Sequence, residues 1–372
     1  MQRYFPRVVL MLGNIVIGLS ILGPAGMLAE LADGLGVSVH AAGLLVTYGA
    51  VVLCVGSPVV ALLTTRIDRR VLLVTTLGLL AAGHAASALA PSYLVILLLR
   101  LAMLAAAAIY TPQAAATVAL IVPERERPSA IAFVFLGWSL AIAGGLPVVT
   151  LIATHFGWRA VYAALAMLSA LGATLLLATL PAGLQGKPLS LQSFADIARD
   201  RTIVLILLVT LLQTSGQFTV FVFLAPLLTG LIGAGPGLIG NATASAIVTT
   251  LGTQRTLALF MGSTLLGMIL WSAGAGFAVV MGTGIFFWGL GFAAINSMQQ
   301  ARLAAAAPDL ASASIALNTS VLYIGQAVGS GIGGLLFADG YLRTTGYVGV
   351  AFVVSACGVL ALTWQRRVTA GS

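Results

Sequence analysis

The sequence predicts an all-α membrane protein with twelve transmembrane helices in two pseudo-symmetric six-helix bundles. Three observations lead to this fold class. Charged residues make up only 7% of the 372 residues and hydrophobic residues 60%, with a mean hydropathy of +1.10, whereas an ordinary soluble domain carries about 25% charged residues. Apolar runs of about 20 residues, the length that crosses a bilayer core, recur along the chain. Basic residues gather in the short polar breaks on one side of those runs.

This composition excludes several classes of protein. A soluble enzyme, a disordered chain, a secreted disulfide scaffold and a nucleic-acid-binding protein all need more polar surface than so few charges provide. The net charge of +8 does not indicate an anionic partner, because the basic residues lie in short loops, where they set membrane topology. The 43 glycines are typical of helices that pack closely in lipid. We expect no metal, no cofactor and no nucleic-acid partner, and a monomer in the lipid bilayer.

Turn-forming residues such as Asp33-Gly34 and Pro308-Asp309 separate the apolar runs. The spans predicted from the runs are approximately 8–30, 41–64, 71–90, 92–121, 128–153, 158–181, 202–228, 234–252, 255–277, 279–305, 312–337 and 344–365. The first run has about 23 residues and exceeds the ~7–15 residues of a signal-peptide core, so we expect an uncleaved helix.

The distribution of Lys and Arg predicts the orientation. Of the 17 basic residues, only Arg159 and Arg343 fall in the loops assigned to the outside, and Arg100 falls within a span. All others lie on the side of the N-terminus, which is therefore expected to be cytoplasmic. We predict a first bundle over 1–181, a cytoplasmic linker over 182–201 and a second bundle over 202–372. Weak similarity between Thr64–Leu72 and Thr249–Leu257 fits two parallel halves.

Several stretches together resemble one family, the major facilitator superfamily, and within it the arabinose-efflux-permease type of drug/proton antiporters. They are Ala29–Ser38, Arg66–Arg70, Arg100–Pro112, Gly144-Gly145-Leu146-Pro147 with Gly157-Trp158-Arg159, Gln217-Phe218 and Ala225–Leu228. The resemblance covers nearly the whole chain. It implies secondary transport by alternating access in the bacterial inner membrane, with helices 1, 4, 7 and 10 lining a central cavity.

The sequence departs from the family in two places. The family loop after helix 2 reads Gly-x-x-x-Asp-Arg-x-Gly-Arg-Arg; here Thr65 replaces the Asp and Asp68 the second Gly, beside Arg66 and Arg69. We expect this gating loop to hold the two halves together more weakly, because Thr brings no charge to a facing helix dipole. The segment available for helix 8 is also short: residues 236–252 rise about 25 Å as a helix, less than the ~30 Å core. Either this helix is truncated, or it starts within 231–235 as an irregular segment that faces protein.

Neutral polar side chains mark the expected substrate cavity. Gln213 and Gln217 lie four residues apart and share one face of helix 7. The other expected cavity residues, all within the predicted spans, are Asn14, Arg100, Tyr110, Gln113, Asn296, Gln299 and Gln326. A polar face is costly in contact with lipid; the alternative is that these side chains make hydrogen bonds between packed helices.

Proton coupling has few candidate residues. All nine acidic residues lie in loops or at helix ends, so no carboxylate is expected deep in the membrane. Arg100 is the one charge well inside a span, and the sequence leaves two interpretations open: a cavity residue that relays protonation, or a structural Arg bonded to helix carbonyls. Glu30 at the outer end of helix 1 is the second coupling candidate. On helix 5, Gly144, Gly145 and Pro147 predict a hinge or a close-packing site.

The favoured function is export of a small neutral or amphipathic molecule, such as a drug, a sugar or a nucleoside-like compound, with proton exchange as an open option. An importer or facilitator of the same fold is the near alternative. A transport-impaired relative that acts as a sensor or scaffold is a further alternative, motivated by the short helix 8. A membrane enzyme is not expected, because the spans lack paired His, Asp or Cys residues.

Overall fold

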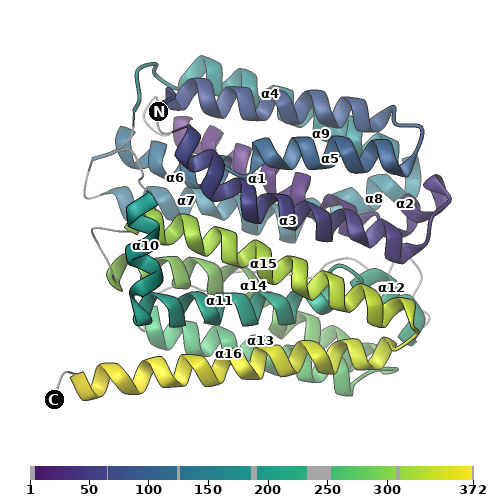
Figure 1. Cartoon of the computed structure of the whole chain (residues 1–372). Coiled ribbons are helices and arrows are strands. Elements are labelled where there is room, and N and C mark those ends of the chain that lie inside the picture. Colours follow the sequence, from purple (N-terminus) through teal and green to yellow (C-terminus); the bar gives the residue numbers. More distant parts are fainter. Residues whose placement is uncertain are drawn as a thin grey trace. The chain divides into compact units, whose positions relative to one another are not determined.

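A computed structural model describes residues 5–64, 66–123, 126–185, 191–232, 253–306 and 311–370. The predicted span 234–252, the short helix 8 of the sequence analysis, lies outside these residues, and so does Thr65. The chain divides into two compact units, Met1–Leu189 and Ser190–Ser372 (Figure 1). Every regular element among the described residues is a helix.

The first unit contains helices α1 to α9. Their bounds are α1 Phe5–Gly26, α2 Leu28–Leu35, α3 Val39–Leu63, α4 Arg69–Ala88, α5 Tyr93–Ala107, α6 Tyr110–Ile121, α7 Arg127–Leu140, a π-helical turn Ala141–Gly145, α8 Leu146–Phe156 and α9 Trp158–Thr179. Helix α1 packs against α7 and α9, α3 against α5, and α4 against α5 and α9.

The second unit contains helices α10 to α16. Their bounds are α10 Leu191–Arg199, α11 Arg201–Phe221, α12 Leu224–Ile232, α13 Thr253–Ala273, α14 Ala278–Ala306, α15 Ala311–Ala338 and α16 Leu342–Ala370. Helix α11 is central to this unit and packs against α14, α15 and α16.

The predicted class of an all-helical membrane protein is confirmed. Among the described residues, nine helices are long and apolar enough to cross a membrane, and two shorter apolar helices are 257–273 and 278–292. Many large apolar side chains lie on the surface, for example Leu63 at 75% exposed, Leu89 at 84% and Val279 at 82%. Such a surface suits hydrocarbon rather than water.

Several predicted spans are interrupted rather than continuous, and proline explains where. The span 92–121 breaks between α5 and α6 at Ala108, four residues before Pro112. The span 202–228 breaks between α11 and α12 at Val222, four residues before Pro226. Proline has no N–H to donate to the carbonyl four residues earlier, and its ring crowds that carbonyl.

Two further interruptions also lie close to a proline. The π-helical turn in the middle of the span 128–153 contains Ala143, four residues before Pro147. The span 8–30 ends early, because the chain leaves helical geometry at Met27 after Pro24 and a separate short helix, α2, begins at Leu28. A proline leaves the carbonyl four residues before it without its helical N–H donor, and inside a membrane another group must satisfy that carbonyl.

Local sequence signals fix several helix starts. Ser38 accepts a hydrogen bond from the Ala41 N–H at the start of α3. Asp200 accepts from the N–H groups of Thr202 and Ile203 at the start of α11. These side chains occupy acceptor positions that satisfy the first free N–H groups of a helix.

A stripe of glycines lets α15 approach α11 closely. A Cβ atom at Gly325, Gly329 or Gly333 would collide with the carbonyl oxygens of Leu211, Ser215 and Thr219 respectively. The spacing of four residues on both helices keeps the stripe on one face. Close backbone approach of this kind is how membrane helices associate without a hydrophobic driving force.

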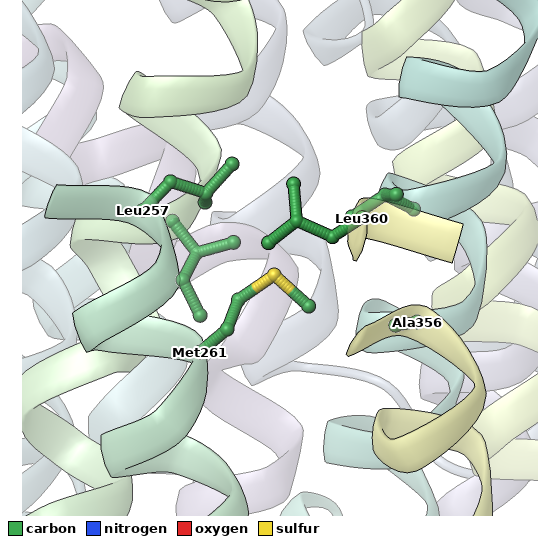
Figure 2. Packing of buried hydrophobic residues seen from close by; sticks show 6 residues of the cluster. Leu257, Met261, Ala356 and Leu360 are labelled. Atoms are coloured by element: carbon green, nitrogen blue, oxygen red, sulfur yellow. The ribbon is translucent and has the colours of Figure 1, made fainter. Parts of the chain in front are cut away.

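An apolar core holds α13 and α16 to α11 and α14. It consists of Val209, Leu257, Met261, Ile295, Ala356 and Leu360. Figure 2 shows Leu257 and Met261 of α13 pointing toward Leu360 of α16. This core lies in the same unit as the polar residues of α11 and α14 described next.

Candidate functional site

A chain of side-chain hydrogen bonds joins α11 and α14 inside the second unit. The Trp288 indole Nε1 donates to Gln217 Oε1 at 3.1 Å. Gln217 Nε2 donates to Gln213 Oε1, and Gln213 Nε2 donates to Thr214 Oγ1 at 3.0 Å. Gln213, Gln217 and Trp288 are each only 3% exposed. Two amides and an indole therefore form one buried polar group, which we call the amide cluster.

Aromatic rings surround the amide cluster. Phe218 and Phe221 follow the glutamines on α11, and Phe292 lies one turn after Trp288 on α14. The ring centroids of Phe221 and Phe292 are 4.9 Å apart, and those of Trp288 and Phe292 are 6.3 Å apart. Phe221 meets Trp288 edge-on at 6.4 Å. A polar centre with aromatic walls is the usual composition of a small-molecule site.

A second polar network lies further along the same helices. Gln299 Nε2 donates to the Ile206 carbonyl at 3.0 Å and approaches Thr210 Oγ1 at 3.3 Å. Thr210 Oγ1 donates to Asn318 Oδ1 at 2.8 Å, and Asn318 Nδ2 donates to Asn296 Oδ1 at 3.1 Å. The structure thus brings the predicted Asn296 and Gln299 together through Thr210 and Asn318.

Arg302, which the sequence analysis counted among the basic residues of the cytoplasmic side, joins this network. It is buried within α14, and its guanidinium donates to Gln299 Oε1 at 2.8 Å and to Thr363 Oγ1 at 3.0 Å. Its place on the helix face of Gln299, three residues earlier, is the signal that sequence reasoning missed. Gln326 on α15 is buried, and neither network includes it.

In the first unit, Asn14 of α1 joins α6 and α7. Asn14 Nδ2 donates to the Val134 carbonyl at 2.9 Å, and Thr111 Oγ1 donates to Asn14 Oδ1 at 2.8 Å. Trp138 Nε1 donates to Thr111 Oγ1 at 3.2 Å. Both ends of the Asn14 amide are therefore occupied by contacts between helices.

Tyr110 and Gln113 of α6 are both buried, and each carries a side-chain oxygen that has no hydrogen-bond partner among the described residues. The Tyr110 ring lies against Gly13 of α1, where even a methyl group would not fit beside the hydroxyl. Within the described part of the chain, the Tyr110 hydroxyl and Gln113 Oε1 have no hydrogen-bond partner. Buried polar atoms without a partner are uncommon in folded proteins, so these two mark an unusual part of α6.

Arg100 is 1% exposed and donates to three backbone carbonyls. Nε donates to Leu45 at 2.7 Å, Nη1 to Ser20 at 2.9 Å and Nη2 to Ile21 at 2.6 Å. The sequence left two interpretations of Arg100 open. These three contacts match the structural one, in which the guanidinium donates to helix carbonyls.

His84 of α4 completes this buried polar region. The Ser20 hydroxyl donates to the Val16 carbonyl at 2.7 Å and lies 2.8 Å from His84 Nε2. A hydroxyl has one proton, so Nε2–H is the donor in the second contact. His84 of α4 and Arg100 of α5 both contact Ser20 of α1. The sequence did not link them, because the three residues lie on three different helices.

Glu30 does not end the first transmembrane helix, contrary to the expectation from the span 8–30. It lies in the first turn of α2, half-buried, beyond the break at Met27. A carboxylate in the first turn interacts favourably with the helix dipole, which is a local reason for its position.

The predicted gating loop is organised around Asp68. Its Oδ1 accepts from the Val71 N–H at 3.1 Å as the cap of α4, and its Oδ2 accepts from the Gly183 N–H at 2.5 Å. The Arg69 N–H donates to the Leu184 carbonyl at 2.9 Å, while the Arg69 side chain is buried and Arg66 is exposed. The loop therefore holds the segment after α9, within the same unit.

The backbone contacts of Asp68 change its acidity. Desolvation acts to raise the pKa of Asp68, but hydrogen bonds from the backbone N–H groups around it outweigh that effect and lower the pKa below its ordinary value of 3.8. The donors are Val71, Gly183, Arg70 and Leu184. A carboxylate that accepts several N–H bonds is stabilised in its charged form.

The predicted hinge residues of helix 5 lie at the π-helical turn. Gly144 and Gly145 end this turn and Pro147 follows in the first turn of α8. A Cβ at Gly145 would meet Leu19 Cδ2 of α1 at 2.6 Å, whereas Gly144 has open space around it. Gly145 is thus a close-packing position, and Gly144 leaves room beside an interrupted helix.

The fold and these buried networks define a multi-pass membrane protein with networks of hydrogen-bonded polar side chains inside its helix bundles. The sequence model of the Major Facilitator Superfamily matches residues 10–330. The chain therefore belongs to the major facilitator superfamily. It is a secondary transporter of a small molecule and not an enzyme. This confirms the predicted transporter class.

Named relatives agree with this family. The chain is 27% identical over 361 residues to the inner membrane transport protein YdhP of Escherichia coli K12, covering 91% of this chain and 90% of YdhP. It is 25% identical over 379 residues to a Mannheimia succiniciproducens protein named a probable sugar efflux transporter, covering 97% and 93%.

Solved structures show the same fold. The human organic anion transporter MFSD10 (TETRAN) superimposes with a TM-score of 0.75 at 15% identity, covering 96% of this chain and 99% of that chain. A bacterial homologue of the human lysosomal transporter Spinster, inward-facing and unoccupied, gives a TM-score of 0.71 at 16% identity, covering 97% of each chain.

Trp288 is the main site residue that the sequence analysis did not single out. It stands in an apolar run, and its ring alone suggests packing. An indole N–H inside a span needs an acceptor, however, and Trp is always a donor. A search for acceptors on neighbouring helices would have pointed to the glutamines of α11.

Proposed function

We propose that this protein exports small neutral or amphipathic molecules across the inner membrane by alternating access of its two units. The proposal includes the efflux-permease type of drug/proton antiporter as the subclass. It is supported by the relative named a probable sugar efflux transporter and by the helix 5 stretch Gly144–Pro147 that resembles the antiporter signature. We further propose that residues 182–201 form the cytoplasmic linker.

The observation that carries the proposal is the amide cluster with its aromatic walls. Two glutamines and an indole offer hydrogen bonds without a net charge, and no acidic residue of the sequence falls deep within a predicted span. A cationic ligand would lack a counter-charge there and bear a large desolvation cost. A neutral or amphipathic molecule with a flat apolar face fits the composition of the cluster.

Transport by purified protein in proteoliposomes tests this function. We expect Gln217→Ala to reduce transport about fivefold or more, because leaving the buried partners of its amide unsatisfied costs about 1–3 kcal/mol. The matched control is Gln192→Ala, which changes an exposed glutamine of α10 and should transport like the wild type. Equal loss in both variants, or no loss in either, contradicts the assignment of the cluster.

The direction of transport needs a separate experiment. Cells that express the protein should accumulate less of a transported compound than cells without it, and a proton uncoupler should abolish the difference if protons are exchanged. Net accumulation in expressing cells would identify an importer. Substrate binding without movement in either direction would identify a sensor or scaffold instead.

Proton coupling is proposed to depend on Glu30 or Arg100. An imposed pH gradient should drive transport in proteoliposomes, and Glu30→Gln or Arg100→Gln should remove the response. If both variants keep gradient-driven transport, coupling resides elsewhere. If the wild type equilibrates substrate and ignores the gradient, the protein is a facilitator.

A further inference from the structure

The direction of the hydrogen bonds in the amide cluster is set by Trp288. An indole nitrogen donates and cannot accept, so the group of Gln217 that faces it must be the amide oxygen, as the 3.1 Å contact shows. The Gln217 nitrogen then faces Gln213 and donates to its oxygen. The Gln213 nitrogen in turn donates to Thr214 Oγ1. One donor-only residue therefore orients both amides.

In this orientation the groups without partners are amide N–H donors and not amide oxygen acceptors. Each amide nitrogen has two N–H groups, and one is used at Gln217 and one at Gln213. The described residues supply no acceptor for the second N–H of either amide. Both amide oxygens already accept one hydrogen bond, and a buried oxygen with one partner is better tolerated than a buried N–H with none.

We infer that the amide cluster selects flat, neutral molecules by an acceptor oxygen, such as a carbonyl, and that Trp288 is the positioning residue for this selectivity. The inference rests on the proposed function and adds a substrate class to it. The aromatic walls formed by Phe218, Phe221 and Phe292 accept the flat face of the ligand. Its oxygen accepts the free N–H of Gln217 or Gln213.

Three rigid tricyclic probes isolate the chemistry. 9-Fluorenone carries one acceptor carbonyl, carbazole carries one N–H donor, and fluorene carries no polar group, while all three have a similar flat shape. Binding of each is measured by calorimetry on the full-length protein in nanodiscs. Partition of the probe into lipid is the same for every protein variant, so it cancels when affinity ratios are compared between variants.

For the wild type we expect fluorenone to bind about tenfold more tightly than carbazole, with fluorene between them. Trp288→Phe keeps an aromatic ring but removes the indole N–H, so the Gln217 amide is free to rotate. The ratio of fluorenone affinity to carbazole affinity should then fall to about one. Trp138→Phe is the matched control, since it removes an indole donor in the first unit and should leave the ratio at its wild-type value.

A second variant, Gln217→Met, tests the same selectivity in case Trp288→Phe fails to fold. Gln217→Met is similar in length and has no N–H, so one of the two free donors is lost and the preference for fluorenone over fluorene and carbazole should fall below its wild-type value. The inference is overturned if the wild type shows no preference for fluorenone, or if Trp288→Phe and Gln217→Met keep the wild-type ratio. Transport that depends on Gln217 together with an unchanged ratio would refute this selectivity alone and leave the proposed function intact.

Discussion

Arg100 donates a hydrogen bond to the Ser20 carbonyl, which a proline leaves without its helical N–H donor. Arg100 Nη1 donates to the Ser20 carbonyl at 2.9 Å, and the residue four positions after Ser20 is Pro24, which has no N–H to give that carbonyl. A carbonyl without a donor inside a membrane costs several kcal/mol. A buried guanidinium and a helix proline therefore compensate each other across α1 and α5.

Gly49 of α3 makes room for this guanidinium, so we predict that Gly49→Ala destabilises the protein. A Cβ there would lie 2.6 Å from Leu104 Cδ1 and 3.3 Å from Arg100 Nε. The expected cost is about 1–3 kcal/mol in the free energy of unfolding, and Arg100→Met should cost at least as much. Denaturant titration in detergent measures both. Gly78→Ala on α4, which has open space, is the control and should be neutral or slightly stabilising.

Tyr110 provides a test that separates stability from function. Its hydroxyl is buried without a partner among the described residues, so Tyr110→Phe should leave the free energy of unfolding unchanged or raise it by up to about 1 kcal/mol. Tyr93→Phe, which loses a 2.7 Å bond to the Ala41 carbonyl, should lower it by about 1 kcal/mol. If Tyr110 contacts substrate, Tyr110→Phe will reduce transport while remaining stable; a marked loss of stability would show that the hydroxyl has a structural partner.

Asp68 should make stability depend on pH. Its pKa is lowered in the folded protein by backbone N–H groups, so its contribution is complete above the unfolded-state value of 3.8 and is lost as pH falls below it. Asp68→Ala removes the cap of α4 and should cost about 1 kcal/mol near pH 7. Thermal unfolding at several pH values should show the difference between Asp68→Ala and wild type shrinking toward pH 3. A difference that stays constant with pH would argue against the carboxylate as its origin.

The contact between α15 and α11 should be intolerant of added side chains. At Gly329 a new Cβ would collide with the backbone of Ser215 on α11, and a backbone atom cannot move aside as a flexible side chain does. Gly329→Ala should therefore lower the free energy of unfolding by about 2 kcal/mol or more. Gly262→Ala on α13 has open space and serves as the comparison. Equal behaviour of the two variants would contradict the close packing.

The predicted orientation is open to labelling. In a Cys54→Ala, Cys357→Ala background, a membrane-impermeant maleimide added to intact cells should label Asp33→Cys and not Gln192→Cys. Both positions are exposed, so a permeant maleimide should label both. Labelling of Gln192→Cys from outside would reverse the assigned topology and place the 182–201 segment on the outer side.

Composition and hydrophobic run length were sufficient to predict the membrane class and the position of the described spans, because a bilayer imposes a minimum length and an apolar surface on every crossing. The same rules did not show where helices break. Pro112 and Pro226 interrupt their spans four residues earlier, a local effect that a hydropathy pattern averages away.

The site was predicted in part, and the missing parts share one cause. Spacing along a single helix placed Gln213 and Gln217 on one face, and the structure links them by a hydrogen bond. Trp288, the Ser20 carbonyl and Thr363 entered only when other helices were brought alongside. The sequence alone determined which polar residues fall within the long apolar runs. The tertiary structure decided which of them are buried together and satisfy one another, because a hydrogen bond requires two atoms within about 3 Å and contacts between helices depend on packing that no single run of residues encodes.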